Sequence, residues 1–190
     1  MDTTNESLLV RVRNTEDSRS WREFDALYRP VLKRYARARG LKPPDAEDLA
    51  QECMRTLVKR LPTFEYCRRK GRFSSWLHTV ANNQINKMLS RRRAGRADTS
   101  VLKALAQPED ELVLWERVWL REHLKFCLRA VGDEFAPKTM QAFERTVLDD
   151  IPVERVCETL GMNRNQVYLA RSRVLRKLKE KMSELIGLEG

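Results

Sequence analysis

Glycine and proline are scarce in this chain of 190 residues, which contains seven of each. Both residue types interrupt regular helices and mark turns. Because apolar residues also recur at helical spacing along most of the chain, the sequence predicts an all-α fold. The helical pattern dissolves once, between Ala94 and Glu111. We therefore expect two small helical domains joined by a flexible linker.

The residues that build catalytic and metal centres are also few and scattered. The four cysteines form no CxxC pair, and neither of the two histidines lies at zinc-ligand spacing from them. The chain has no glycine-rich phosphate loop and no HExxH motif, and it shows no order of serine, histidine and aspartate typical of a triad. The sequence thus predicts a protein that is not an enzyme and that binds no cofactor and no metal ion.

Long apolar runs are missing as well, since charged residues interrupt every apolar stretch within a few positions. The first residues, Met1 to Ser7, lack the basic start and apolar core of a signal peptide. We therefore expect a cytoplasmic protein that is not inserted in a membrane. The net charge of +10 favours a polyanionic partner, with nucleic acid first and an acidic membrane surface second.

The C-terminal segment from Ile151 to Leu178 has the pattern of two helices around a tight turn. Pro152 suits the first position of a helix, and Gly161 suits its left-handed end. Asn163 and Gln166 have the spacing of a capping box that starts a second helix. This arrangement predicts a helix-turn-helix motif, although an αα-hairpin with a solvated basic face would show the same pattern.

The second helix of this hairpin is predicted to bind duplex DNA. Val167, Ala170, Val174 and Leu178 recur on its buried side, so polar residues face outward from its start. N-terminal side chains of a recognition helix meet base edges in the major groove. The candidate DNA-binding residues are Arg164, Asn165, Gln166, Tyr168, Arg171, Ser172, Arg173, Arg176 and Lys177.

The first half of the chain predicts three longer helices. The first begins near Ser20 and fades near Gly40, and Asp45 is expected to cap the second. A third helix is expected to restart at Phe73, with Ser74 as its cap. Between the second and third helices lies a loop that mixes aromatic and basic residues. Aromatic rings can stack on unpaired bases while basic side chains neutralise phosphates.

An acidic cluster stands out in this basic chain, at the start of the second predicted helix. A role as the helix cap would explain Asp45. The other members lie off the apolar face of the helix, and capping does not explain them. An acidic face suits a protein partner while the rest of the molecule binds DNA. The candidate protein-binding residues are Asp45, Glu47, Asp48, Gln51 and Glu52.

Three strings together resemble the bacterial sigma factors of the extracytoplasmic-function type. They are Trp21-Arg-Glu-Phe-Asp-Ala-Leu-Tyr-Arg-Pro30, Asp45-Ala-Glu-Asp-Leu-Ala-Gln-Glu52 and Phe73-Ser-Ser-Trp-Leu-His-Thr-Val-Ala-Asn-Asn83. Their order, the linker and the C-terminal hairpin are similar to the two-domain plan of that family. One departure lies after Val167, where Tyr168-Leu-Ala-Arg171 stands in place of the usual Lys-Ser-Arg-Leu, so the promoter sequence cannot be inferred from better-known members.

The resemblance implies a role for each domain. Residues 1–93 would be sigma domain 2, which grips the clamp coiled coil of core RNA polymerase and opens the minus-ten element. Residues 94–111 would be the linker, and residues 112–190 would be sigma domain 4, which recognises the minus-thirty-five element and contacts the polymerase flap. An anti-sigma factor is a usual partner in the family. The chain lacks a heptad seam, so we expect a monomer.

The minus-ten contacts implied by the resemblance lie in the aromatic and basic loop and on the helix after it. An extruded base needs a pocket that recognises its edge, and family members build that pocket there. For Trp76, burial in the core is the competing interpretation of its spacing. The candidate single-strand contacts are Phe64, Tyr66, Arg68, Arg69, Lys70, Arg72, Trp76, Asn83 and Lys87.

Two other functions stay open from the residues alone. A helix-turn-helix regulator that never touches polymerase would explain the hairpin and the charge, but not the acidic cluster or the loop before Trp76. A helical RNA-binding protein would explain the charge, whereas the capped, groove-sized helix argues against it. Co-elution with core RNA polymerase and promoter-specific initiation would separate all three.

Overall fold

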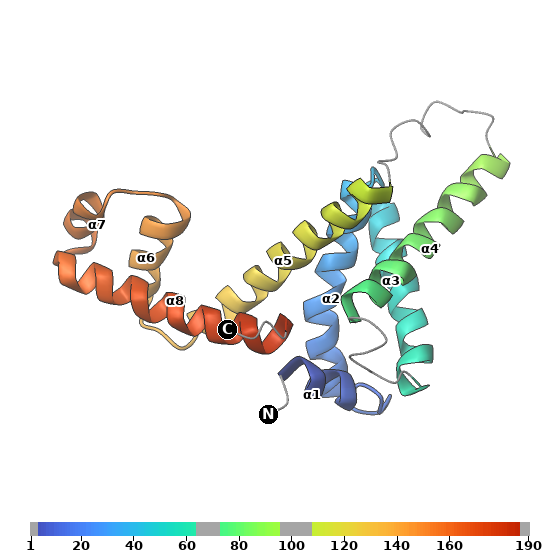
Figure 1. Cartoon of the computed structure of the whole chain (residues 1–190), viewed down its shortest axis with the longest axis horizontal. Coiled ribbons are helices and arrows are strands. Elements are labelled where there is room, and N and C mark those ends of the chain that lie inside the picture. Colours follow the sequence, from blue (N-terminus) through green and yellow to red (C-terminus); the bar gives the residue numbers. More distant parts are fainter. Residues whose placement is uncertain (1–3, 64–72, 96–107, 187–190) are drawn as a thin grey trace. The chain divides into compact units, whose positions relative to one another are not determined.

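The computed structural model describes residues 4–63, 73–95 and 108–186, and these residues form helices and the turns between them (Figure 1). The described residues contain no strand, and the all-α prediction is confirmed. The contacts between Cα atoms divide the chain into two compact units, one of Glu6–Glu122 and one that includes His123–Gly190. Each unit is described separately below.

The first unit contains α1 (Thr4–Arg11) from Glu6 onward, α2 (Ser18–Ala38), α3 (Pro43–Arg60), the short 3₁₀ turn η1 (Leu61–Thr63) and α4 (Phe73–Gly95). Asp17 caps α2, because its carboxylate accepts the Ser20 backbone N–H at 3.0 Å and the Ser20 hydroxyl at 2.6 Å. The apolar stripe predicted on this helix forms the core. Its fully buried members are Phe24, Leu27, Tyr28, Val31, Leu32 and Tyr35.

The start of α3 differs from the prediction. The helix begins at Pro43, its N-cap residue is Lys42, and Asp45 lies in the first turn instead of at the cap. Proline is compatible with this position because the first helical N–H groups have no partner within the helix and its fixed φ angle matches the helix. Asp45 is still placed where a negative charge favours the positive end of the helix dipole.

The first unit extends into α5 (Pro108–Gly132), whose amino-terminal half packs on α2 and α4. Trp115 is 1% exposed, and its ring lies edge-on to Tyr35, with centroids 5.0 Å apart. Its indole N–H donates to the Ser74 hydroxyl at 2.9 Å. Ser74 therefore lies inside α4, which begins at Phe73, and the prediction that it caps the helix was wrong.

This packing places the structural boundary differently from the expected one. Residues 94 and 95 belong to α4, and residues 108–111 belong to α5, so helices cover both ends of the expected linker; residues 96–107 lie outside the described part of the chain. The aromatic contacts that Trp115 and Trp119 make with Tyr28, Tyr35 and Phe73 hold the first half of α5 in the first unit. The compact unit therefore ends near Glu122.

The second unit contains the rest of α5, α6 (Pro137–Phe143), the π-helical turn η4 (Glu144–Leu148), α7 (Val153–Leu160) and α8 (Arg164–Ile186). A small core joins α6, α7 and α8 through Ala142, Val156, Val167 and Ala170. Pro152 is the N-cap residue of α7, one position earlier than predicted. Gly161 ends α7 in the left-handed conformation at φ 57°, as predicted.

Candidate nucleic-acid interface

The start of α8 is held by the predicted capping box. The Asn163 side-chain oxygen accepts the Gln166 backbone N–H at 2.8 Å, and the Gln166 side-chain oxygen accepts the Asn163 backbone N–H at 2.9 Å. Both interactions satisfy N–H groups that a helix start otherwise leaves without a partner. The first turn of α8 is thus fixed in place, and the NH₂ group of Gln166 makes none of the capping bonds.

The outer face of α8 presents most of the predicted DNA-binding side chains. Val167, Ala170 and Val174 are buried, so the opposite side of the helix is directed outward. Asn165, Ser172 and Arg176 form one row on this outward side, and all three are exposed. Arg164, Gln166, Tyr168 and Arg173 are exposed beside that row, whereas Arg171 and Lys177 are partly covered.

Two of these cations are already paired within the second unit. Arg164 Nη2 lies 2.6 Å from the Glu154 carboxylate of α7, and Lys177 Nζ lies 3.1 Å from the Glu134 carboxylate. The hydrogen bond that Lys177 donates to the Glu134 carboxylate raises the pKa of Lys177. Exposed pairs of this kind contribute little to stability, so both cations can exchange their partner for a phosphate at small cost.

Only some of the residues predicted to bind the minus-ten element lie in the described part of the chain. Phe64, Tyr66, Arg68, Arg69, Lys70 and Arg72 lie outside the described residues. The described candidates lie along one side of α4: Asn83 is seven residues after Trp76, and Lys87 is four residues after Asn83. Asn83 and Lys87 are exposed there, while Trp76 is half-buried and its ring lies 5.7 Å from that of Phe73.

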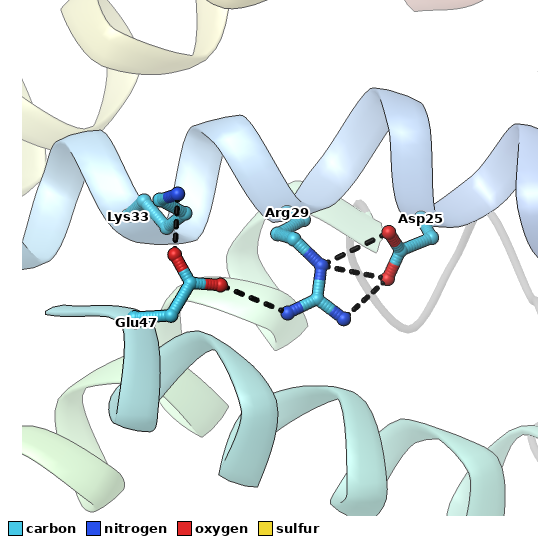
Figure 2. Close-up of polar contacts among 4 residues, drawn as sticks. All are labelled: Asp25, Arg29, Lys33 and Glu47. Atoms are coloured by element: carbon cyan, nitrogen blue, oxygen red, sulfur yellow. Dashed lines mark hydrogen bonds and ion pairs between the residues drawn. The ribbon is translucent and has the colours of Figure 1, made fainter. Parts of the chain in front are cut away.

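Glu47, one member of the acidic cluster on α3, faces basic residues of α2 (Figure 2). Glu47 pairs with Lys33 and, at 3.3 Å, with Arg29, whose guanidinium also binds Asp25 at 2.7 Å. The hydrogen bond from Lys33 lowers the pKa of Glu47. Glu47 therefore has a structural role between two helices, which its sequence position did not indicate.

The other acidic candidates lie further from these cations. Asp48, Gln51 and Glu52 are exposed on α3, and Glu52 pairs with Arg55 of the same helix at 2.5 Å. Asp45 is half-buried in the first turn. The face of α3 that the sequence predicts to bind a protein thus lies beside basic side chains of α2, and it is less acidic than the sequence pattern indicated.

A largely buried polar network, which the sequence pattern did not indicate, lies where α2, α4 and α5 meet. Tyr35, Arg39, His78, Asn82 and Glu111 are joined there by hydrogen bonds of 2.6 to 3.5 Å. Burial raises the pKa of Tyr35 and lowers that of His78. In the sequence these residues look like polar residues at the edge of an amphipathic helix. Solvated residues have the same pattern, so the sequence could not show that these side chains form a buried network.

Neither a metal site nor a membrane span is found among the described residues. No three histidine, cysteine, aspartate or glutamate side chains among them are grouped so that they could hold a metal ion. Within the same ranges, no helix combines the length and the apolar character that crossing a bilayer would require.

Residues 25–95 match the family model described as sigma-70 region 2. A solved structure titled as an RsbN-BldN complex contains a chain that is 19% identical, with a TM-score of 0.36; the match covers 90% of this chain and 96% of that one. None of the curated proteins compared matches this chain significantly.

The family match covers α3 and α4, which carry the second and third sequence strings, and most of α2, which carries the first. Members of this family act by binding and not by covalent catalysis, in accordance with the prediction that the chain is not an enzyme. Residues 25–95 of the chain therefore carry a sigma-70 region 2 domain.

Proposed function

We propose that this protein is a sigma factor of the extracytoplasmic-function type, which directs core RNA polymerase to specific promoters from the cytoplasm. In this proposal α8 recognises the minus-thirty-five duplex, and the segment from Phe64 to Arg72 with α4 melts the minus-ten element. The α3 surface around Asp48 and Glu52 docks on the polymerase clamp, and an anti-sigma factor stays a predicted partner.

The observation that carries the proposal is the outward face of α8. Its first turn is fixed by the Asn163 and Gln166 capping box, and Asn165, Ser172 and Arg176 are exposed in one row behind that start. A helix of this kind inserts its N-terminal side chains into the major groove, where asparagine pairs with adenine and arginine with guanine. The region 2 domain in the same chain supplies the second element of promoter binding.

The region 2 domain also weighs against the two alternatives. A regulator that binds only duplex DNA has no use for a domain that binds polymerase and opens DNA, and neither has a general RNA-binding protein. The exposed stripe of Asn83 and Lys87 on α4 supports contact with a displaced strand, because a basic and an amide side chain one turn apart can bind phosphate and base together.

The experiment is transcription from a promoter library by core polymerase reconstituted with this chain. We expect initiation at a restricted set of promoters and a permanganate-sensitive bubble at the minus-ten element. A variant with a Gly/Ser segment in place of residues 64–72 should keep duplex binding but lose the bubble. Transcription that does not depend on the added chain would contradict the proposal, and a bubble that persists in the variant would contradict the role of the segment.

A further inference from the structure

Leu169 is an apolar side chain in the middle of the polar outward face of α8. It is 53% exposed, whereas Val167 and Ala170 beside it in the sequence are buried. Asn165 lies four residues before it, Ser172 three residues after it and Arg176 seven residues after it, so all four share one face of the helix. Leu169 therefore faces the same partner as these polar residues.

The residues around Leu169 indicate which kind of partner can bind there. A shallow cavity of about 220 Å³ opens beside it, between α6 and α8, and Lys138 and Arg173 stand on its walls. Both cations are exposed, and Arg176 follows on the other side of Leu169. An apolar protein surface would have to desolvate these cations, whereas a DNA duplex would neutralise them with phosphates and leave Leu169 over the base edges.

A leucine side chain has no hydrogen-bond donor or acceptor, so it can distinguish bases only by contact and shape. The apolar group that a base pair exposes in the major groove is the C5-methyl of thymine. Leu169 is the sixth residue of α8, within the part of a recognition helix that lies deepest in the groove. Its reach over the bases is set by the same rigid first turn that places Asn165.

We infer that Leu169 is a specificity-determining residue, which packs on the C5-methyl of a thymine in the minus-thirty-five element. The inference rests on the proposed function of α8 and adds a thymine preference to it. Asn165 and Arg176 would then recognise hydrogen-bonding edges and phosphate on either side, while Leu169 selects the methyl group between them.

The test removes the methyl group from the DNA instead of changing the whole base. A preferred minus-thirty-five duplex is first selected from a random library with the full chain bound to core polymerase. Each thymine in it is then replaced by uracil, one at a time. We expect one replacement to weaken binding about four-fold, the factor that corresponds to one buried methylene-sized group. In Leu169→Ala the thymine and uracil duplexes should bind equally, and Leu169→Met should restore the difference.

Leu148 provides the matched control, because it is a leucine of the same 53% exposure in η4, outside α8. Leu148→Ala should keep the wild-type preference for thymine, and the two alanine variants should melt at similar temperatures. Equal binding of thymine and uracil duplexes by the wild-type chain would overturn the inference, and so would an unchanged preference in Leu169→Ala. If Asn165→Ala and Arg176→Ala also left binding unchanged, the proposed function of α8 itself would fail.

Discussion

Arg39 and Glu111 form a buried ion pair, with 2.6 Å between Nη2 of the arginine and Oε1 of the glutamate. Their side chains are 3% and 19% exposed. Arg39 follows the last turn of α2, and Glu111 lies in the first turn of α5. The same guanidinium donates to the Tyr35 hydroxyl and to the Asn82 side-chain oxygen, both at 2.9 Å. This ion pair and its hydrogen bonds therefore connect the start of α5 to α2 and α4.

Removal of the Glu111 charge should destabilise the first unit. In Glu111→Gln the Arg39 guanidinium stays buried without a counter-charge, so we expect the free energy of unfolding to fall by about 3 kcal/mol. Urea denaturation followed by tryptophan fluorescence measures the change. Glu116→Gln is the control, since Glu116 is exposed on the same helix. If Glu111→Gln lowered the free energy of unfolding no more than Glu116→Gln does, the prediction would be contradicted, and water would have to screen the ion pair.

Truncation should show that the first half of α5 belongs to the first unit. A fragment that ends at Gly95 exposes the apolar surface that Trp115 and Trp119 cover, whereas a fragment that ends at Glu122 keeps it buried. Because burying a large aromatic side chain contributes about 3 kcal/mol or more, the longer fragment should melt at a clearly higher temperature. Circular dichroism during heating tests this. Equal melting temperatures would place the boundary before α5.

The first unit should lose stability as His78 becomes protonated. Nε2 of His78 lies 3.0 Å from both the Tyr35 hydroxyl and the Asn82 amide nitrogen, with Arg39 and Glu111 as the nearby charges. Burial lowers the pKa of His78 below its ordinary value of 6.5, so the unfolded chain binds the proton more readily. The free energy of unfolding should therefore fall from about pH 7.5 to about pH 5.5.

His78→Gln provides the comparison for this pH dependence, because glutamine does not titrate. The difference between the wild-type and variant unfolding curves isolates the histidine from carboxylates that titrate at lower pH. Glu47 is one of these, since its pKa is lowered and its contribution is lost only as the pH falls below its ordinary value of 4.5. Parallel stability curves for the two proteins between about pH 7.5 and about pH 5.5 would contradict the prediction.

Charge reversal on α3 should separate docking from folding. We expect Asp48→Lys together with Glu52→Lys to weaken binding to core polymerase in a pull-down, because both side chains are exposed and point away from the core. Glu47→Gln removes the pairs with Arg29 and Lys33 and should cost less than about 1 kcal/mol of stability, since the pairs are largely solvated. Unchanged polymerase affinity with both reversals would remove α3 from the docking surface.

Two neighbouring asparagines at the start of α8 should have different roles. Asn163→Ala removes the cap and should destabilise the second unit by about 1 kcal/mol. Asn165→Ala should leave stability unchanged and relax the base preference at one or two positions, because its exposed side chain makes none of the capping bonds. Thermal melting and selection from a minus-thirty-five library measure the two effects. Retention of the wild-type base preference in Asn165→Ala would exclude this residue from recognition.

The sequence by itself determined the features that depend on neighbouring residues. The all-α fold, the stripe from Phe24 to Tyr35 and the left-handed Gly161 all follow from local periodicity and backbone sterics. The Asn163 and Gln166 capping box is confirmed for the same reason, since its atoms are three residues apart. The sequence strings, together with the C-terminal hairpin, indicated a sigma factor, and the region 2 match at residues 25–95 agrees with them. Such motifs can be found in a sequence because each is itself a local pattern.

Only the tertiary structure decided the features that join distant segments. Glu47 resembled its acidic neighbours until α2 placed Arg29 and Lys33 opposite it. Trp115 belonged by sequence to the second domain, yet its ring is buried against Tyr35 in the first unit. A charge or a ring has the same local propensity whether it is solvated or buried. Its role is therefore set by the desolvation and packing energies that arise only when helices far apart in the chain meet.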